Sequence, residues 1–186
     1  MILRYDLNSE LRLISYDVAV PSGRTHETIN LVTLGVMAVG YAYGRTQGLA
    51  ADLEAALPPP ARTAFLASYL VGTFLITPDL DLAENQVRAK ENWGLLGLLW
   101  VPYGHLFKHR GLSHSWLLGP LTRLIYIALL GLLFSVLAAA LGPHLGYEFR
   151  FEAQLGDAWR EFALGAVIGY YLSQWLHLIA DGIRPG

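Results

Sequence analysis

The sequence contains no cysteine, which excludes disulfide bonds, thiolate metal sites and cysteine nucleophiles. Charged residues are also scarce. They make up 15% of the 186 residues, whereas soluble domains carry about a quarter. The net charge of −2 offers no basic surface for a phosphate backbone, so nucleic acid is not an expected partner. The chain is instead rich in hydrophobic residues, at 54%, and this balance indicates a membrane protein with lipids as partners.

Four uncharged stretches predict helices that cross a membrane. They comprise residues 28–44, 63–78, 124–147 and 162–180, and the third helix is expected to start earlier, near Ser115. A helix needs about 20 residues to cross the hydrocarbon core, so the first two stretches are short. A buried helix pair in a soluble protein is the alternative for these two. Residues 1–20 lack the apolar stretch of a cleaved signal peptide, so insertion would depend on the internal helices.

The segments between these stretches complete the predicted architecture. Three consecutive prolines, at residues 58–60, prevent helix before the second stretch. The longer segment 82–114 carries Trp93, Trp100 and Tyr103 among leucines, a pattern typical of a short helix lying at the membrane interface. The predicted fold is therefore all-α: a polytopic, up-and-down bundle of four transmembrane helices with a short interfacial helix.

Histidines and aspartates occur at the ends of all four predicted helices. In chain order the pairs are His26 with Asn30, Asp79 with Asp81, His109 with His114, and His177 with Asp181. In an up-and-down bundle, the starts of the first and third helices share a face with the ends of the second and fourth. All four pairs are therefore expected to meet at one face of the membrane.

The spacing and chemistry of these residues favour metal binding. His177 and Asp181 are four residues apart, so they lie on one face of a helix and can hold one ion. Imidazole and carboxylate ligands without sulfur suit a divalent metal, most readily Zn²⁺, with Mn²⁺ or Fe²⁺ as alternatives. The number of ligands exceeds the need of one tetrahedral ion, so one or two ions are expected. The predicted metal ligands are His26, Asp79, Asp81, His109, His114, His177 and Asp181.

Each of these motifs also has a purely structural interpretation. An HxxxD pair on a helix is short, a DxD after proline is often a turn, and His109 with His114 could contact lipid headgroups. Their combination favours a metal site, because ionisable residues at membrane depth are costly and usually functional. His105 and His144 match none of the pairs and are expected to be ordinary interfacial residues.

The motifs resemble a family of uncharacterised predicted metal-binding membrane proteins. The residues that carry the resemblance are PSGRTH at 21–26, PDLD at 78–81, HRGLSHS at 109–115 and HLIAD at 177–181, of which HRGLSHS is the most specific. Their order is similar to that of inner-membrane metal-dependent hydrolases of the LexA-binding type. Lipid phosphatases of the vanadium-haloperoxidase type fit less well, because no arginine lies between Ser173 and His177 to hold phosphate.

The resemblance covers about residues 21–181 and implies a domain organisation. Residues 1–20 precede the point where members of this family usually begin, and Val20 stands directly before PSG. A GTG start codon read as Val20 would explain residues 1–20 as an N-terminal extension. Residues 21–186 are then expected to form a single membrane metal-binding domain.

The expected function is metal-dependent hydrolysis at the membrane interface, with a lipid or phosphoester as substrate. His109 is expected to act as a ligand or proton carrier. Arg110 is expected to hold an anionic substrate oxygen, because a guanidinium group matches phosphate geometry. The alternative is a metal-binding membrane scaffold or metal carrier without enzymatic activity.

The positive charges predict an orientation. Eight lie on the side of the metal residues and four on the opposite side, with Arg123 left out because it falls inside the third helix. The excess places the metal site and both termini in the cytoplasm, in a multi-pass protein of the inner membrane. The eight are Arg4, Arg12, Arg24, Arg88, Lys90, Lys108, Arg110 and Arg184, and the four are Arg45, Arg62, Arg150 and Arg160.

Overall fold

The structure is a computed structural model that describes residues 22–82, 87–108, 111–148 and 156–184. Within these residues the chain is all helical, as predicted, and contains no strand. In chain order the elements are α2 (Gly23–Thr46), α3 (Ala51–Ala56), α4 (Pro59–Phe74), η2 (Pro78–Asp81), α5 (Arg88–Asn92), η3 (Gly94–Trp100), α6 (Val101–Leu106), η4 (Leu112–His114), α7 (Leu118–Leu141), η5 (Gly142–Leu145) and α8 (Trp159–Ala180). The predicted extension 1–20 lies outside the described residues.

The four long helices correspond to the four predicted stretches, with shifted ends. Helix α4 begins at Pro59, where the fixed φ of proline suits the first turn. It ends before Thr77, which is extended because Pro78 follows it. Helix α7 begins at Leu118 rather than near Ser115, because Ser115 is extended and its Oγ accepts a hydrogen bond from the backbone of Gly119.

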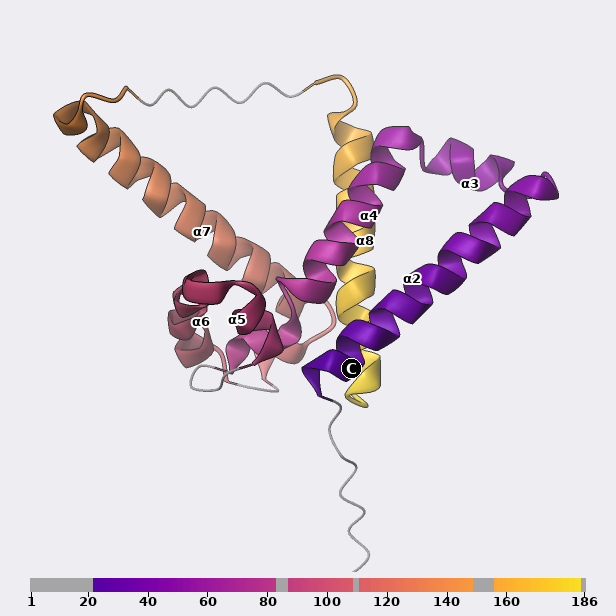
Figure 1. Cartoon of the computed structure of the whole chain (residues 1–186), viewed down its shortest axis with the longest axis horizontal. Coiled ribbons are helices and arrows are strands. Elements are labelled where there is room, and N and C mark those ends of the chain that lie inside the picture. The colour runs from indigo at the N-terminus through magenta and orange to yellow at the C-terminus, as the bar shows by residue number, and fades with distance from the viewer. Residues whose placement is uncertain (1–21, 83–86, 109–110, 149–155, 185–186) are drawn as a thin grey trace, which may run out of the picture.

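Helices α4 and α8 form the packed centre of the molecule and lie side by side in Figure 1. Two glycines of α8 make this contact close. A Cβ atom at Gly165 would lie 1.9 Å from the carbonyl oxygen of Ala61, and one at Gly169 would lie 2.2 Å from that of Phe65. Only hydrogen fits at these positions, as in helix pairs whose interfaces consist of small residues.

Helices α2 and α7 meet this pair at one end and diverge from it at the other (Figure 1). The buried residues of α2 are His26 and Asn30, and those of α7 are Gly119, Pro120 and Arg123. All five lie in the first turns of their helices. The up-and-down order therefore holds, but the four helices do not pack along their whole lengths, and the predicted bundle is supported only in part.

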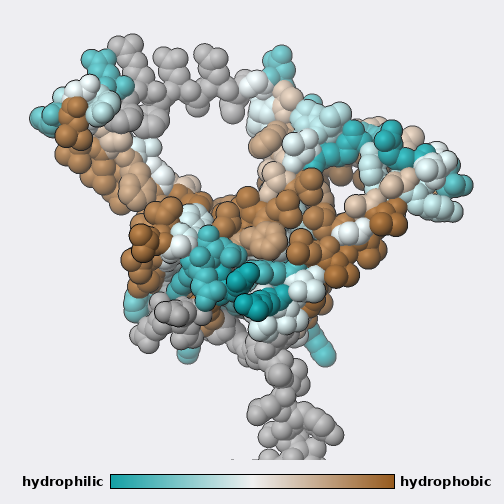
Figure 2. All heavy atoms as spheres, in the orientation of Figure 1, coloured by the Kyte–Doolittle hydropathy of each residue, from teal (hydrophilic) through white to brown (hydrophobic). Residues whose placement is uncertain are grey.

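Two of the four helices are long and apolar enough to cross a membrane. They are the segments Leu118–Leu145 and Trp159–Ala180. No residue in the most apolar part of Leu118–Leu145 is buried within the protein. Apolar side chains cover the outside of α7 and α2 in Figure 2, and Leu129 of α7 is 59% exposed. These features give weak support to membrane association. Helices α2 and α4 are not among the two that are long and apolar enough to cross a membrane.

The predicted interfacial helix is replaced by three short helices, α5, η3 and α6. Trp100 and Tyr103 do not lie on the surface but are almost fully buried, where they pack edge to face with each other and against Tyr126 of α7. The expectation that these two rings lie exposed at a membrane interface was wrong, because they form a local core, while the position of the segment at the interface stays a prediction. The leucines between them, such as Leu95, are the exposed residues of this segment.

Candidate metal centre

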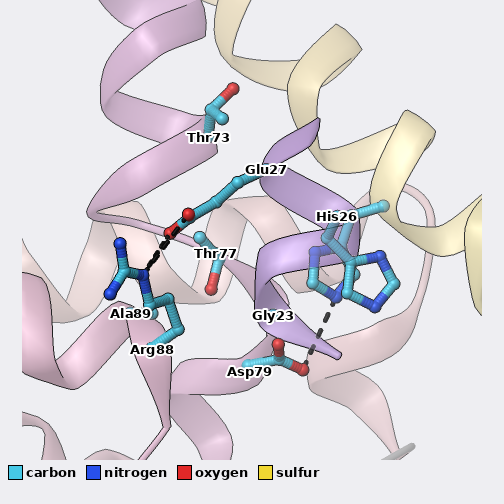
Figure 3. Close-up of a pocket in the computed structure, with 9 residues that line it drawn as sticks. Gly23, His26, Glu27, Thr73, Thr77, Asp79, Arg88 and Ala89 are labelled. Carbon is cyan, nitrogen blue, oxygen red and sulfur yellow. Dashed lines mark hydrogen bonds and ion pairs between the residues drawn. The ribbon is translucent and has the colours of Figure 1, made fainter. Parts of the chain in front are cut away.

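Four of the predicted ligands converge where the long helices meet. His26 lies in the first turn of α2, Asp79 in η2, His177 in the last turn of α8, and Asp181 directly after that helix. The Nε2 atom of His26 is 3.2 Å from Asp181 Oδ1. The Nε2 atom of His177 is 3.4 Å from Asp181 Oδ2 and 3.5 Å from Asp79 Oδ1. Figure 3 shows His26 and Asp79 on the same side of the adjoining pocket.

The two imidazole rings of this cluster are stacked. The ring centroids of His26 and His177 are 3.7 Å apart and the planes differ by 14°. Both side chains are buried, at 4% and 3% exposure. One ligand atom each from His26, His177 and Asp181 lies within 4.8 Å of the others, a separation that one ion can bridge.

Unsatisfied polar atoms provide a test of whether a metal ion fits. Within the described residues, His26 Nδ1, His177 Nε2 and Asp181 Oδ1 are buried and have no hydrogen-bond partner, so the distances above are close approaches without hydrogen-bond geometry. A buried polar atom without a partner costs about 1–3 kcal/mol. Nitrogen and oxygen donors of this kind are the ligands of Zn²⁺, Mn²⁺ and Fe²⁺. The cluster therefore fits a divalent ion.

The electrostatics of the carboxyl groups agree with this fit. Burial by itself would raise the pKa of Asp79 and Asp181, but the neighbouring histidines reverse that effect. The pKa of Asp79 is lowered through His177 and then His26, and the pKa of Asp181 is lowered well below its usual range by both imidazoles. Both groups are therefore carboxylates at neutral pH, the form that binds a metal.

The remaining described ligands, Asp81 and His114, form a second group. His114 Nδ1 lies 2.9 Å from Asp81 Oδ2, which also accepts a hydrogen bond from Ser113 Oγ. The charge of Lys90 acts on the same carboxylate. The two aspartates of the PDLD motif thus turn to different partners, Asp79 to α8 and Asp81 to η4. The sequence predicted one cluster of ligands. In the described residues the ligands instead form two groups, which are joined through η2.

Three other sequence-based expectations concern His109, Arg110 and Asn30. His109 and Arg110 lie outside the described residues, so their roles stay predictions. Asn30, which is paired with His26 in the sequence, instead donates from Nδ2 to Thr73 Oγ1 and to the Ser173 carbonyl oxygen. It joins α2 to α4 and α8.

Arg123 is a buried residue whose importance the sequence did not reveal. It is fully buried in α7, donating from Nη1 to the Ser113 carbonyl oxygen (2.8 Å) and from Nη2 to Gln174 Oε1 (2.9 Å). It thereby ties the segment preceding His114 to α8. Its signal in the sequence is that it carries the one charge of an otherwise apolar helix, a position where charge is costly.

In the described residues, apolar helices bring buried imidazole and carboxylate groups without hydrogen-bond partners together, an arrangement that fits a metal-binding protein. A family model described as uncharacterized metal-binding protein (DUF2227) matches residues 21–186, and the chain belongs to that family. It is also 38% identical over 71 residues to an uncharacterized protein of Aquifex aeolicus (strain VF5), an alignment that covers 38% of this chain and 49% of that protein. The chain thus spans about half the length of the curated relative it matches. No solved structure matches the chain.

Proposed function

We propose that this protein is a membrane-embedded, metal-dependent hydrolase whose metal centre lies at the membrane interface. The observation that supports catalysis over a structural role is a pocket that reaches the cluster and is lined by His26, Asp79 and His177. A structural metal site is closed by protein ligands, whereas a catalytic site keeps a position open for water or substrate. Relation to the LexA-binding type of hydrolase rests on the motif order alone.

His26, Asp79, His177 and Asp181 are the proposed ligands of the first ion. Helix α8 fixes the spacing of His177 and Asp181, and ring stacking fixes the orientation of His26 relative to His177. Asp81 accepts from Ser113 and lies beside His114, an arrangement that resembles the carboxylate–histidine pairs found behind metal ligands. His114 is the proposed ligand of a second ion.

The chemistry of the proposed centre follows from its donor set. A bound divalent ion supplies a Lewis acid that polarises an ester oxygen and lowers the pKa of a coordinated water. The protein residues keep the carboxylates ionised and hold the rings in place. Zn²⁺ is the proposed metal, with Mn²⁺ and Fe²⁺ as the alternatives that the same ligands accept.

The proposed setting is the inner membrane, crossed by α2, α4, α7 and α8. Helix α7 has 24 residues and is about 36 Å long, enough for the hydrocarbon core of about 30 Å. Its exposed apolar surface supports a lipid environment. The distribution of positive charge supports a cytoplasmic metal site.

Metal analysis of the purified protein tests the metal centre. We expect one or two equivalents of divalent metal in the wild type and loss of at least one equivalent in His177→Ala. The matched controls are His105→Ala and His144→Ala, because both side chains are exposed and lie outside the cluster. Unchanged metal content in His177→Ala would place any metal elsewhere.

A screen of phosphoester substrates with each metal then separates the enzyme from the alternative function. A metal-binding scaffold or carrier would retain bound metal without turnover. The description of the family as metal-binding is equally compatible with that alternative.

Labelling of single cysteines tests the orientation, because the chain has none of its own. Gln47 follows α2 at the far end of the molecule, and Lys108 precedes HRGLSHS; both are exposed. We expect a membrane-impermeant thiol reagent to label Gln47→Cys in intact cells and to leave Lys108→Cys unlabelled until the cells are lysed. The reverse pattern would place the metal residues outside.

A further inference from the structure

The pocket beside the metal cluster has a second wall that the metal ligands do not explain. Besides His26, Asp79 and His177, it is lined by Gly23, Glu27, Thr73, Thr77, Arg88 and Ala89. Its enclosed part measures about 10 Å³, and the space including its open side is about 200 Å³. About 10–15 Å³ is the enclosed space that a single water needs. A ligand larger than water would therefore have to extend from the enclosed part towards the open side.

Thr77 supplies an unused polar group to this wall. Its side chain is buried, at 7% exposure, and its hydroxyl has no hydrogen-bond partner among the described residues. It lies in the extended backbone between α4 and η2, and Figure 3 places it between Arg88 and Asp79. A buried hydroxyl without a partner is costly, and a ligand oxygen in the pocket would satisfy it.

Arg88 supplies a positive charge at the edge of the same wall, where its side chain is 41% exposed. Its Nε atom donates to both carboxylate oxygens of Glu27, at 3.3 and 3.4 Å, which holds the guanidinium plane. Its Nη1 atom is 3.9 Å from Glu91, too far for a hydrogen bond. In the described part of the chain the outer N–H groups of Arg88 therefore make no hydrogen bond. A guanidinium group in this state matches two oxygens of a phosphate.

Gly23 is the reason that Arg88 can lie so close to the metal residues. A Cβ atom at Gly23 would be 2.8 Å from the Cβ of Arg88, closer than real Cβ atoms approach one another. Glycine at the first position of α2 therefore lets α5 sit against the turn that carries His26. The placement of Arg88 depends on a residue that carries no polar group of its own.

A bound metal ion changes the net charge of the pocket, and with it the ability of the pocket to bind an anion. Without a metal, the described residues that line the pocket carry two carboxylates, Glu27 and Asp79, with Asp181 beside them, against one guanidinium group, that of Arg88, so an anion is repelled. With a divalent ion bound, its two charges and that of Arg88 balance the three carboxylates. The bound ion therefore removes the net repulsion that an anion would meet in the metal-free pocket.

We propose that Thr77 and Arg88 form an oxyanion subsite that binds the non-reacting oxygens of a phosphate group held against the metal residues. This inference rests on the proposed metal centre and names its substrate class, a phosphate ester. The phosphate belongs either to a lipid headgroup or to a soluble compound, since the recognising groups are the same for both.

Calorimetric titration of the full-length protein in detergent tests the subsite in two steps. Zn²⁺ is titrated first, and inorganic phosphate is then titrated into protein that carries Zn²⁺ and has been freed of excess metal. We expect Arg88→Gln to weaken phosphate binding by roughly 10- to 100-fold, as expected for a hydrogen bond to a charged group, and Thr77→Val by roughly 2- to 10-fold. Binding of Zn²⁺ should be unchanged in both variants, which also shows that they are folded.

Two further variants sharpen the test. Gly23→Ala should weaken phosphate binding by displacing Arg88, although it removes no polar group. Arg45→Gln is the matched control, because Arg45 is also an exposed arginine paired with a glutamate, Glu54, but lies at the other end of α2. A parallel titration with a soluble short-chain phosphatidic acid identifies the source: tighter binding than phosphate indicates a lipid headgroup, and weaker binding a soluble phosphate.

The outcomes separate this inference from the metal centre on which it rests. Failure of the wild type to bind Zn²⁺ would overturn the metal centre and the subsite together. Zn²⁺ binding without phosphate binding, or with equal phosphate binding by wild type and Arg88→Gln, would overturn the subsite alone. Loss of Zn²⁺ from Arg88→Gln would assign Arg88 a structural role and would overturn the subsite as well.

Discussion

Two regions of the molecule differ in the contacts that they make. One is the polar end, which carries the histidines, and the other is the remaining length of helices α2 and α7. At the polar end, buried residues such as Asn30, Asp81 and Arg123 are held by hydrogen bonds to other segments. Along their remaining length, α2 and α7 expose apolar side chains and contact little of the α4–α8 pair. This contrast suits a protein whose helices are surrounded by lipid and whose chemistry occurs at one end. The apolar helix surfaces would contact lipid, and the polar end would keep a defined geometry.

The largest expected effect lies in the contact between α4 and α8, near the ends of these helices that lie away from the histidines. Gly165→Val would place a side chain within 2 Å of the Ala61 carbonyl oxygen and force the two helices apart. We expect a loss of roughly 3 kcal/mol or more in the free energy of unfolding, because overpacking against backbone cannot relax. Thermal unfolding in detergent measures it.

The control for this prediction is Gly131→Val in α7. A Cβ at Gly131 meets nothing within 4 Å, so this substitution should leave stability nearly unchanged. Equal destabilisation by both substitutions would show that the close α4–α8 contact does not hold the molecule together.

The next effect tests the surroundings of α7. Leu129 lies near the middle of that helix and is 59% exposed. In water, Leu129→Arg would change stability by less than about 0.5 kcal/mol. In a bilayer the same change should cost roughly 2.5–3.5 kcal/mol of insertion free energy.

Membrane insertion of Leu129→Arg, with Leu129→Ala as the conservative control, distinguishes these settings. A reduced membrane-inserted fraction for the arginine variant alone would support lipid contact along α7. Insertion equal to that of the wild type would mean that this apolar surface faces something other than lipid.

How far the sequence predicts these two regions depends on the kind of signal each residue carries. Uncharged runs located the four long helices, and their alternating direction correctly brought His26, Asp79, His177 and Asp181 together. Apolar runs carry no information about the angles at which helices cross, so the divergence of α7 and α2 from the central pair could not be predicted from them.

The remaining differences are local and have physical causes. One turn of 3₁₀ helix sends Asp79 and Asp81 to different partners, and a DxD spacing does not reveal that choice. Aromatic rings suit both membrane interfaces and protein cores. For this reason the sequence predicted Trp100 at an interface, whereas the residue is buried in a core. Arg123 was left out of the charge count because it falls inside the third helix, although a charge within an apolar helix is itself a sign of function.

A smaller effect concerns the second group at the polar end. Asp81→Asn keeps the shape of the side chain but removes the charge that faces Ser113 and His114. Replacing a carboxylate behind a metal-binding histidine typically lowers metal affinity by about 10- to 100-fold. We expect a loss in this range for the more weakly bound of two equivalents, measured by competition with a chelator. Loss of the tighter equivalent instead would make Asp81 a ligand of the first ion.

The smallest effect is expected at the far end, where polar contacts are present but exposed. Arg45 Nε lies 2.9 Å from Glu54 Oε1, which also accepts a hydrogen bond from Tyr41, and the arginine side chain is 63% exposed. Because exposed ion pairs contribute only about 0–1 kcal/mol, Arg45→Gln should shift the unfolding temperature little and leave metal content unchanged. Salt should weaken this pair, since surface charges are screened, while the buried contacts of Arg123 should resist it. Unfolding temperatures of Arg45→Gln and Arg123→Met at low and high salt test this difference. If Arg45→Gln proved as damaging as Arg123→Met, the stability of the molecule would not be concentrated at the metal-binding end.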